Sequence, residues 1–382
     1  MGRHYLDHAS TAPPRPEVAD AVRAWLFGPW ADPGRVHEEG RHVRAAVEGA
    51  REEVAALLSV RPRQIIFTSG GTEAANAAAW GAARAQPGSA IICAEVEHSA
   101  VRESSERLAP TIPVAVDRHG RIDPAAVAGA LESLAERPPA LVHCQWANHE
   151  VGTLQPVAEI AELCARAGVP LHVDAAAAAG HVDLDLSELD ADLVSVSGHK
   201  FGAPPGTGAL VVRRGSRVEP FIVGGQQERA RRGGLENVPG ILGLGAAAAT
   251  LSANAGTALR READTARGQI ARLVTAALRT AGVSVVGDPD PDHRLPHMVC
   301  LGVAGVEAEP VLLGLDRAGI AAHSGSACSS ESLEPSPVLA AMGVDPSRSL
   351  RLSVGWSTTE DDVTAFAGVF DSVVADLRAL SS

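Results

Sequence analysis

Lys200 is the residue whose sequence surroundings best suit covalent chemistry. It ends Ser197-Gly198-His199-Lys200, directly after an apolar run over residues 192–196 that predicts a buried strand. Asp174 ends a similar run over residues 171–174. An amine and a carboxylate at the ends of buried strands are what pyridoxal phosphate needs, as a Schiff-base partner and as a counter-charge for its pyridine nitrogen. Taken alone, Asp174 could equally cap the next helix and Lys200 could be a surface lysine.

A turn upstream of these residues could bind a phosphate group. Residues 68–73, Thr-Ser-Gly-Gly-Thr-Glu, follow a predicted strand and open a predicted helix. Backbone N–H groups and the positive end of the helix dipole would face an anion there, with Gly71 and the Thr72 hydroxyl beside it. Ser197 and His199 could add donors next to the lysine. A glycine-containing helix cap is the simpler interpretation of the turn by itself.

Short β-branched runs alternate with helical stretches over roughly the first 240 residues, and the pattern then changes. Strands are predicted at residues 64–68, 90–92, 141–143, 171–173, 193–196 and 209–212, and helices at 73–85 and 157–167. This alternation predicts an α/β fold with a mostly parallel sheet covered by helices. Long helices follow at 241–252 and 258–281. We expect a large domain over residues 15–255 and a small α+β domain from residues 1–14 and 256–382.

Composition argues against several classes of protein. The chain has 382 residues, 46% of them hydrophobic, which is enough for a large core. A formal net charge of −13 argues against direct nucleic-acid binding. No apolar run approaches a membrane span and the N-terminus does not resemble a signal peptide, so we expect a cytoplasmic protein. The cysteines lack metal-binding spacing and are odd in number, and no metal is expected; they are Cys93, Cys144, Cys164, Cys300 and Cys328.

These residues, in this order, resemble the class V, fold-type I pyridoxal-phosphate enzymes, and more closely the cysteine desulfurases of the iron-sulfur-cluster type. The resemblance extends over nearly the whole chain, through residues 5–7, 68–76, 97–98, 150–152, 172–175, 197–208, 232–237, 323–336 and 351–359. Residues 197–200 mark the cofactor class, and residues 324–330, Ser-Gly-Ser-Ala-Cys-Ser-Ser, look like the long cysteine loop of the desulfurase branch. The implied fold has a large domain with a mostly parallel seven-stranded sheet sandwiched by helices. The small α+β domain would carry the cysteine loop, at about 323–336.

The resemblance assigns cofactor roles to matching positions. Lys200 would form the Schiff base and later move the Cα proton, Asp174 would pair with the pyridine nitrogen, and His98 would stack on the ring and help proton transfer. The phosphate would be held by Gly71, Thr72, Ser197 and His199. The cofactor is therefore expected to be pyridoxal 5'-phosphate.

The resemblance also implies the substrate and the partners. Cys328 would be the thiolate that takes sulfur from L-cysteine, leaving L-alanine and a persulfide. Arg351 would bind the substrate carboxylate, and Asn148 is a second candidate for substrate binding. A homodimer is expected, because residues 232–237 resemble a segment that reaches the neighbouring subunit's site in relatives. The persulfide would pass to a protein acceptor serving iron-sulfur cluster assembly, tRNA thiolation or DNA phosphorothioation.

Three positions near the expected cofactor depart from the family pattern. Ala177 stands where the family usually has a glutamine that contacts the phenolic oxygen of the cofactor, and His149 stands where an asparagine donates to the same oxygen. Leu235 replaces a threonine that the partner subunit offers to the phosphate. Each lost hydrogen bond costs about 0.5–1.5 kcal/mol. We therefore expect weaker cofactor retention, with His149 partly replacing the missing donors.

The sequence leaves three functions open. A cysteine desulfurase is favoured; another fold-type I reaction, such as transamination or selenocysteine lysis, would not depend on Cys328 in the same way. A degenerate paralogue that acts as a scaffold is suggested by Ala177 and Leu235. The joint presence of the expected lysine, aspartate, histidine, cysteine and arginine argues against this last function.

Overall fold

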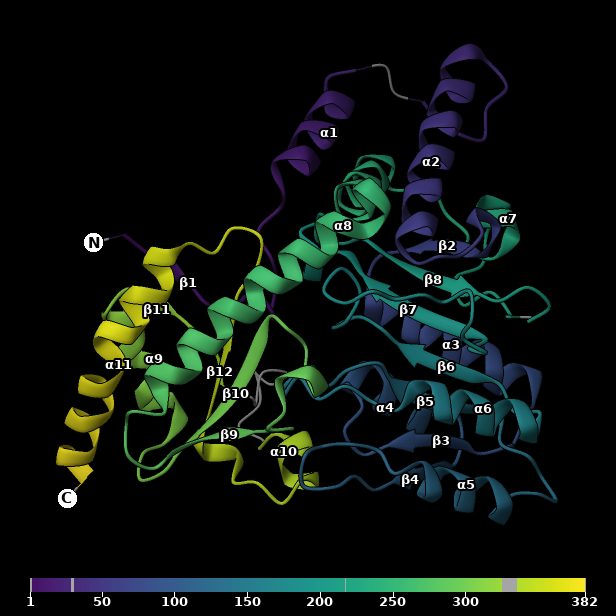
Figure 1. The fold of residues 1–382 in the computed structure, drawn as a ribbon. Helices are drawn as coiled ribbons and strands as arrows, with labels where there is room; N and C mark the ends of the chain where they lie inside the picture. The colour runs from purple at the N-terminus through teal and green to yellow at the C-terminus, as the bar shows by residue number, and fades with distance from the viewer. Residues whose placement is uncertain (1, 29–30, 217, 325–334, 382) are drawn as a thin grey trace.

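The computed structural model describes residues 2–28, 31–216, 218–324 and 335–381. Within them, a seven-stranded sheet has the order β2-β8-β7-β6-β5-β3-β4 (Figure 1). Its pairings are parallel except those of β8 with β2 and β7. The predicted α/β fold with a mostly parallel sheet is confirmed. The strands are β2 (Ile65–Thr68), β3 (Ile91–Ala94), β4 (Thr111–Val114), β5 (Leu141–Gln145), β6 (Leu171–Asp174), β7 (Leu193–Ser197) and β8 (Gly208–Val212).

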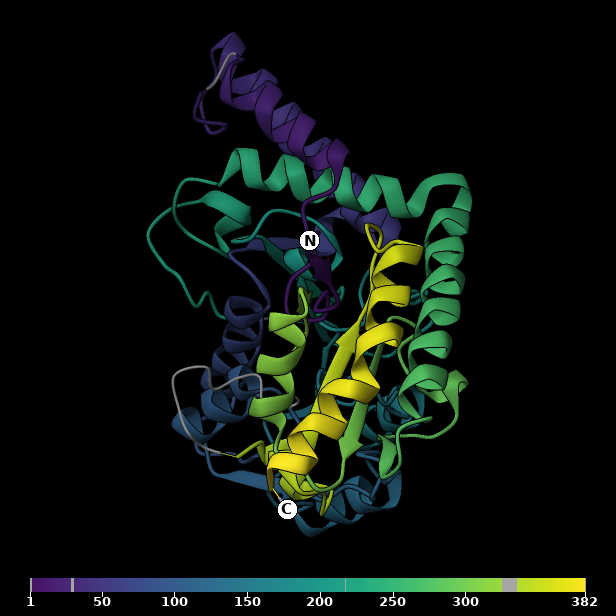
Figure 2. The same ribbon diagram turned by 90° about the vertical axis from the view of Figure 1, so that its left-hand side faces the viewer.

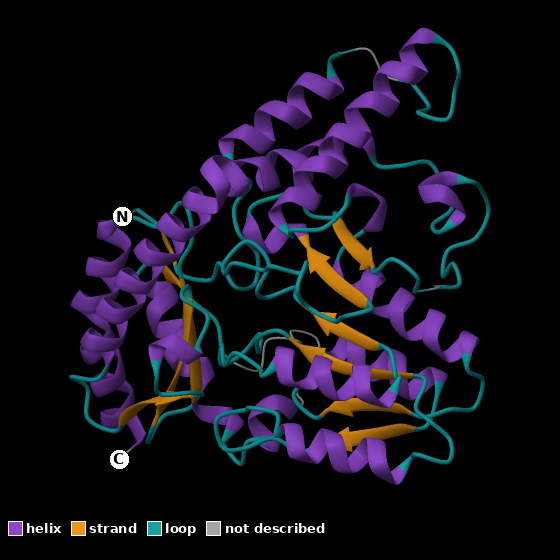
Figure 3. Ribbon diagram, turned by 45° about the vertical axis from the view of Figure 1, so that its right-hand side comes forward, coloured by secondary structure: helices purple, strands orange, loops and turns teal. Residues whose placement is uncertain are grey.

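Helices lie on both faces of this sheet (Figure 3). Every residue of β2, β3, β5, β7 and β8 is buried, which explains why their sequences are apolar without strict alternation. The covering helices are α2 (Glu38–Leu57), α3 (Gly71–Ala85), α4 (Ser99–Leu108), α5 (Pro124–Ser133) and α6 (Val157–Ala167), with η1 (Pro62–Gln64) and η2 (Gly198–Phe201) as single turns. α1 (Pro16–Leu26) packs on α8 and projects with α2 from the top of Figure 1.

A second unit is built on the antiparallel sheet β12-β10-β9. Its N-terminal strand β1 (His4–Tyr5) pairs with β11 (Ile320–Ala321), which fixes the start of the chain on this unit. In Figure 2, α9 (Ala308–Arg317) and α11 (Glu360–Ser381) lie across the sheet. The remaining elements are β9 (Val283–Val286), β10 (Met298–Val303), β12 (Ser349–Ser353), α10 (Pro337–Ala341), η3 (Pro291–His293) and η4 (Pro346–Arg348).

The long helix α8 (Val238–Ala277) joins the two units. Residues 253–256 interrupt it with non-helical backbone, including left-handed φ angles at Asn254 (53°), Ala255 (54°) and Gly256 (74°). This break separates the two predicted helices. The domain boundary at residue 255 stays a prediction. By length and composition α8 could cross a membrane, but half of its most apolar window is buried inside the protein. We therefore interpret α8 as a core helix.

A buried ion pair holds the short helix α7 (Gln227–Ala230) against β2. Arg51 donates from both terminal nitrogens to the Glu228 carboxylate at 2.7 Å, and each side chain is 1% exposed. Glu228 also accepts the backbone N–H of Phe67 at 3.0 Å. Removing Glu228 would leave the buried Arg51 with only the more exposed Glu48 as a counter-charge, so the Arg51–Glu228 pair fixes the position of the 227–232 segment.

Candidate active site

A cavity of about 350 Å³ opens beside the carboxyl ends of β6 and β7 and the start of α3. The carboxyl ends of parallel strands are where α/β sheets place their ligand sites. Asp174 is the last residue of β6, and Lys200 lies in η2, which follows β7 directly. The predicted site residues that line the cavity are Gly71, Thr72, His98, His149, Asp174, Ser197, His199, Lys200 and Arg351.

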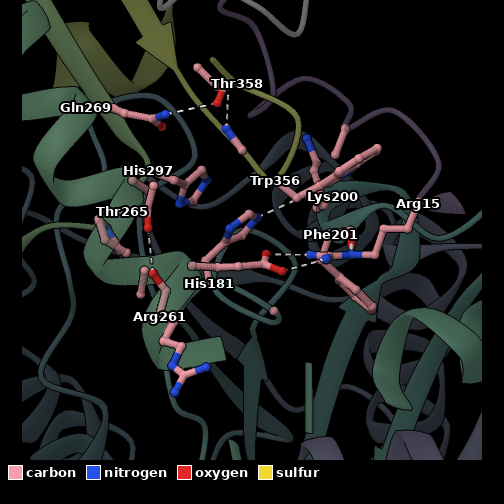
Figure 4. A pocket seen from close by; sticks show the side chains of 17 residues that line it. Arg15, His181, Lys200, Phe201, Arg261, Thr265, Gln269, His297, Trp356 and Thr358 are labelled. Carbon is pink, nitrogen blue, oxygen red and sulfur yellow. Dashed lines mark hydrogen bonds and ion pairs between the residues drawn. The ribbon is translucent and has the colours of Figure 1, made fainter. Parts of the chain in front are cut away.

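Lys200 is held between the cavity and the N-terminal segment. Its Nζ donates to the backbone carbonyl of Ala9 at 2.7 Å and to that of Ser10 at 3.1 Å. Its backbone carbonyl faces the imidazole of His181, whose Nε2 lies 3.0 Å away. Lys200 also lines a second cavity, of about 220 Å³ (Figure 4). The side chain thus reaches the cavity from a backbone that is fixed on the opposite side.

The start of α3 has the shape of an anion-binding turn. A Cβ atom on Gly71 would lie 3.2 Å from the Cβ of Ser197 and 3.4 Å from that of Ala176, so the helix start and the end of β7 meet more closely than most side chains allow. This brings the positive end of the α3 dipole, the Thr72 hydroxyl and the Ser197 hydroxyl to one wall of the cavity. His199 lies on the same wall, where burial and the charge of Lys200 lower its pKa to about 4.

Two histidines form another wall. His98 is the N-cap of α4, and its Nδ1 accepts the backbone N–H of Ala100 at 3.0 Å, which places any proton of the neutral ring on Nε2. Its ring meets that of His149 edge to face, with centroids 4.9 Å apart. Burial lowers the pKa of both histidines, and the nearby charge of Lys200 lowers them further. Both rings are therefore neutral near pH 7, and each can accept or donate a proton.

Arg351, from β12, reaches the cavity from the second unit. One terminal nitrogen donates to the backbone carbonyl of His149 at 2.9 Å, and the other to Asp7 at 3.1 Å and to the Ser10 hydroxyl at 2.7 Å. The side chain is buried, and its Nε has no hydrogen-bond partner among the described residues. A buried guanidinium with unused donor capacity is suited to a carboxylate ligand.

Asn148 does not line the cavity, contrary to the prediction that it binds substrate. Its amide nitrogen donates to the carbonyl of Val96 at 3.2 Å, and its amide oxygen accepts the N–H groups of Glu150 and Val151, both at 2.9 Å. The side chain therefore closes the turn that follows β5. Adjacency to His149 in sequence was misleading, because the two neighbouring side chains point in different directions.

The chain before and after residues 325–334 is attached beside the cavity. His323 and Arg351 exchange two backbone hydrogen bonds. At the other end, the Ser336 hydroxyl donates to Glu150 at 2.5 Å. Burial raises the pKa of Glu150 to about 7, although Ser336 and Arg351 act in the opposite direction. Cys328, the predicted nucleophile, lies outside the described residues.

The three residues that depart from the family pattern lie in different parts of the structure. Ala177 packs against the core and does not line the cavity, where Ala176 is found instead. His149 lines the cavity, as its expected role requires. Leu235 is 64% exposed on the single chain.

The sequence did not reveal Ser10, which contributes to the cavity and bonds Arg351, or Ser195, which bonds Asp174. Ser10 belongs to a segment without a chemical motif. Ser195 is part of the strand that precedes Lys200, and its alternation with the buried Val194 and Val196 was the available signal.

A sequence model of the aminotransferase class-V family matches residues 4–366. The match spans nearly the whole chain and includes every described residue of the cavity. The chain belongs to the class-V aminotransferase family.

Relatives within the family narrow this assignment. The chain is 40% identical to a cysteine desulfurase of Trichormus azollae over 385 residues, covering 99% of this chain and 94% of that protein. It is 38% identical to the cysteine desulfurase IscS of Dictyoglomus turgidum, covering 99% and 96%. Among solved structures, a NifS-like protein superposes with a TM-score of 0.87 at 28% identity, covering 98% of this chain and 100% of that one. SspA in complex with cysteine gives 0.79 at 27% identity, covering 92% and 99%. The chain falls in the cysteine desulfurase branch, as the sequence predicted.

Proposed function

We propose that this chain is a pyridoxal-phosphate-dependent cysteine desulfurase that converts L-cysteine to L-alanine and carries the released sulfur as a persulfide on Cys328. The observation that carries the proposal is one cavity that gathers an amine, a strand-end carboxylate, a glycine-opened helix start and a buried guanidinium. The 40% identical relative named cysteine desulfurase supports the same reaction. The solved structure of SspA with cysteine supports the substrate.

The cavity residues fit pyridoxal phosphate. A side chain at Gly71 would fit only tightly against Ser197 and Ala176, and the bare helix start leaves its backbone donors open to a phosphate, with Thr72, Ser197 and His199 beside them. The Asp174 hydrogen bonds use Oδ1, and its Oδ2 has no partner within the described part of the chain, so Oδ2 can accept a hydrogen bond from the protonated ring nitrogen. When bound, the cofactor supplies an electron-withdrawing ring that labilises the bonds of an attached amino acid.

The chain's own groups then bind substrate and move protons. The amine of Lys200 holds the cofactor and, once displaced by substrate, takes the Cα proton. Neutral His98 lies over the same cavity and carries a proton at Nε2 for transfer. Arg351 binds the substrate carboxylate with a planar pair of donors, which fixes the orientation of the substrate Cα.

Cys328 is the proposed sulfur acceptor within the chain. The four cysteines that the structure describes are buried, and burial raises their thiol pKa, to about 12 for Cys164 and Cys300. Such thiols carry little thiolate at neutral pH and are poor nucleophiles. Cys328 is the fourth residue after Ser324, and four residues of chain span at most about 14 Å. The hydrogen bonds between His323 and Arg351 hold the described end of the chain that precedes Cys328 in sequence beside the cavity.

The decisive experiment measures sulfide release from L-cysteine in the presence of a thiol reductant. Purified protein loaded with pyridoxal phosphate should be yellow, lose the colour on borohydride reduction and release sulfide with an equal amount of alanine. Cys328→Ser should keep the colour and lose sulfide release, whereas Cys164→Ala should keep both. An aminotransferase would convert the amino acid without depending on Cys328, and a non-catalytic scaffold would show no reducible yellow band.

The partners are part of the same proposal. A homodimer is supported by the exposed apolar side chains of Phe221 (41%), Val223 (78%) and Leu235 (64%) near the segment expected to reach a second subunit. Light scattering should give twice the chain mass, and Leu235→Glu should shift the measured mass toward that of the monomer.

The persulfide passes to a protein acceptor, and transfer of labelled sulfur to purified candidate proteins would identify the acceptor. The composition supports a cytoplasmic location without direct nucleic-acid binding, testable by cell fractionation.

A further inference from the structure

A chain of buried polar side chains runs beneath the cavity, away from Asp174. It consists of Ser195 on β7, His172 on β6 and His143 on β5, and these side chains are at most 2% exposed. Strand register brings them together, because Asp174 is paired with Ser195 and His172 with His143. Residues 172 and 174 are two apart on one strand and so point to the same face of the sheet.

The distances make this chain continuous. The Ser195 hydroxyl lies 2.9 Å from Asp174 Oδ1 and 3.2 Å from His172 Nε2. His172 Nδ1 lies 2.8 Å from His143 Nδ1, with the two rings at 82°. The far nitrogen, His143 Nε2, is buried and has no hydrogen-bond partner among the described residues. Three hydrogen bonds therefore connect Asp174 to His143, where the series of hydrogen bonds ends among the described residues.

The position of every proton follows from the charge on Asp174. Burial, and next the charge of Asp174, raise the pKa of the neighbouring Glu97 well above its usual value. An ionised Asp174 can only accept, so Ser195 must donate to it and must accept from His172 Nε2. Burial lowers the pKa of His172 to about 4 and that of His143 well below its usual value, so both rings are neutral. His172 Nδ1 then carries no proton and must accept a hydrogen bond from the Nδ1–H of His143.

We propose that this buried chain positions Asp174 for the ring nitrogen of the cofactor: its three hydrogen bonds all donate toward the carboxylate, which favours the charged form and fixes its orientation. Aligned hydrogen bonds polarise one another, so the two histidines strengthen the serine bond although neither touches the cofactor. The unpartnered His143 Nε2 is a cost of this arrangement, since a buried acceptor without a donor is destabilising. The proposal rests on the cofactor assignment made above but not on the desulfurase reaction.

The first test reads the tautomers directly. Protein labelled with ¹⁵N at its histidines and saturated with pyridoxal phosphate is observed by long-range ¹H–¹⁵N correlation, with assignments from His143→Phe and His172→Gln. We expect His172 to carry its proton on Nε2 alone and His143 on Nδ1 alone. A proton on His172 Nδ1, or a doubly protonated ring at either position, would overturn the proposal. This result is independent of whether the protein releases sulfide.

The second test measures the affinity for pyridoxal phosphate. The cofactor is removed from the folded protein, and the protein is then titrated with pyridoxal phosphate to equilibrium. Loss of a hydrogen bond to a charged group should weaken binding at least about tenfold in Ser195→Ala. Ser105→Ala is the matched control, because Ser105 is equally buried but bonds only a carbonyl within α4 at 2.7 Å; it should stay within about twofold. His172→Gln, which keeps a donor toward Ser195, should bind more tightly than His172→Leu.

Equal affinities for Ser195→Ala and Ser105→Ala, with both proteins folded by thermal melting, would refute the positioning role. If affinity falls as expected but the parent protein releases no sulfide from L-cysteine, the desulfurase proposal fails and the role of the buried chain stands. If the parent protein does not bind pyridoxal phosphate at all, both proposals fail. The affinity measurement thus tests the role of the buried side chains, and the sulfide measurement tests the desulfurase reaction.

Discussion

Replacing Arg351 by glutamine tests the proposed substrate contact most directly. The guanidinium is 2% exposed and lines the cavity, and glutamine keeps part of its volume while removing the charge. A hydrogen bond to a charged group contributes about 1.5–3 kcal/mol, and about 1.4 kcal/mol corresponds to a tenfold change. Loss of one such bond should therefore raise KM for L-cysteine about 10- to 100-fold. Initial rates of alanine formation over a range of L-cysteine concentrations give KM and kcat separately.

The matched variant is Asp7→Asn, because Asp7 binds the same guanidinium in the absence of substrate. It removes the competing charge but leaves the cation, so KM should stay at or below the parent value. Both variants disturb a buried ion pair, and assays should run well below each unfolding temperature, measured by circular dichroism. A KM for Arg351→Gln within about threefold of the parent value would refute the assignment of Arg351 to the substrate carboxylate.

Three further predictions concern stability, measured by urea unfolding. The pKa of Glu150 is about 7 in the folded chain against a usual 4.5, so its protonated form is favoured by folding and parent stability declines as pH rises through this window. Glu150→Gln should lack that decline, so its stability relative to the parent should increase from pH 4.5 to 7; a constant difference would contradict the burial argument. Glu228→Gln breaks the buried pair with its arginine and should cost about 3–5 kcal/mol. By contrast, Asp264→Asn, in an exposed pair, should stay within about 0.5 kcal/mol. Gly180 has a φ of +79°, and a Cβ atom there would lie 2.3 Å from the Cβ of Phe201. Gly168 has a similar φ of +65°, but nothing lies within 4 Å of its Cβ position. Gly180→Ala should therefore lower the free energy of unfolding more than Gly168→Ala does.

The sheet could be predicted from sequence where its strands are buried on both faces. Residues 171–173 and 193–196 were predicted within one residue of β6 and β7, because a short, mostly apolar run that contains valine is typical of a buried strand. β4 was missed, because this edge strand includes Pro113 and buries only its last residue. The order of the strands in the sheet could not be predicted from local sequence patterns, because it depends on distant segments. For example, β8 pairs with β2, and these strands are about 140 residues apart in sequence.

The candidate site divides in the same way. Lys200 and Asp174 could be predicted because a charged group at the end of a buried strand is unusual enough to require an explanation. The contacts of Asp7 and Ser10 with Arg351 could not, since they join the two ends of the chain across 344 and 341 positions. Asn148 shows the converse limit: residue type and neighbourhood indicated a ligand contact, but the amide bonds Val96 and the backbone of the turn after β5.

The two cavities that meet at Lys200 show why the site depends on how the two units pack. Figure 4 shows the second cavity, where His181 of the large unit stacks on His297 of the small unit with ring centroids 3.5 Å apart. Beside them Arg15 binds Glu262 of α8 through two bonds of 2.7 Å and also donates to the carbonyl of Phe201 at 2.9 Å. These contacts hold the η2 turn from behind, while the front of the lysine faces the cofactor cavity. Because Arg351 of the small unit also lines the cofactor cavity, a change that separates the two units would disturb both the lysine and the guanidinium.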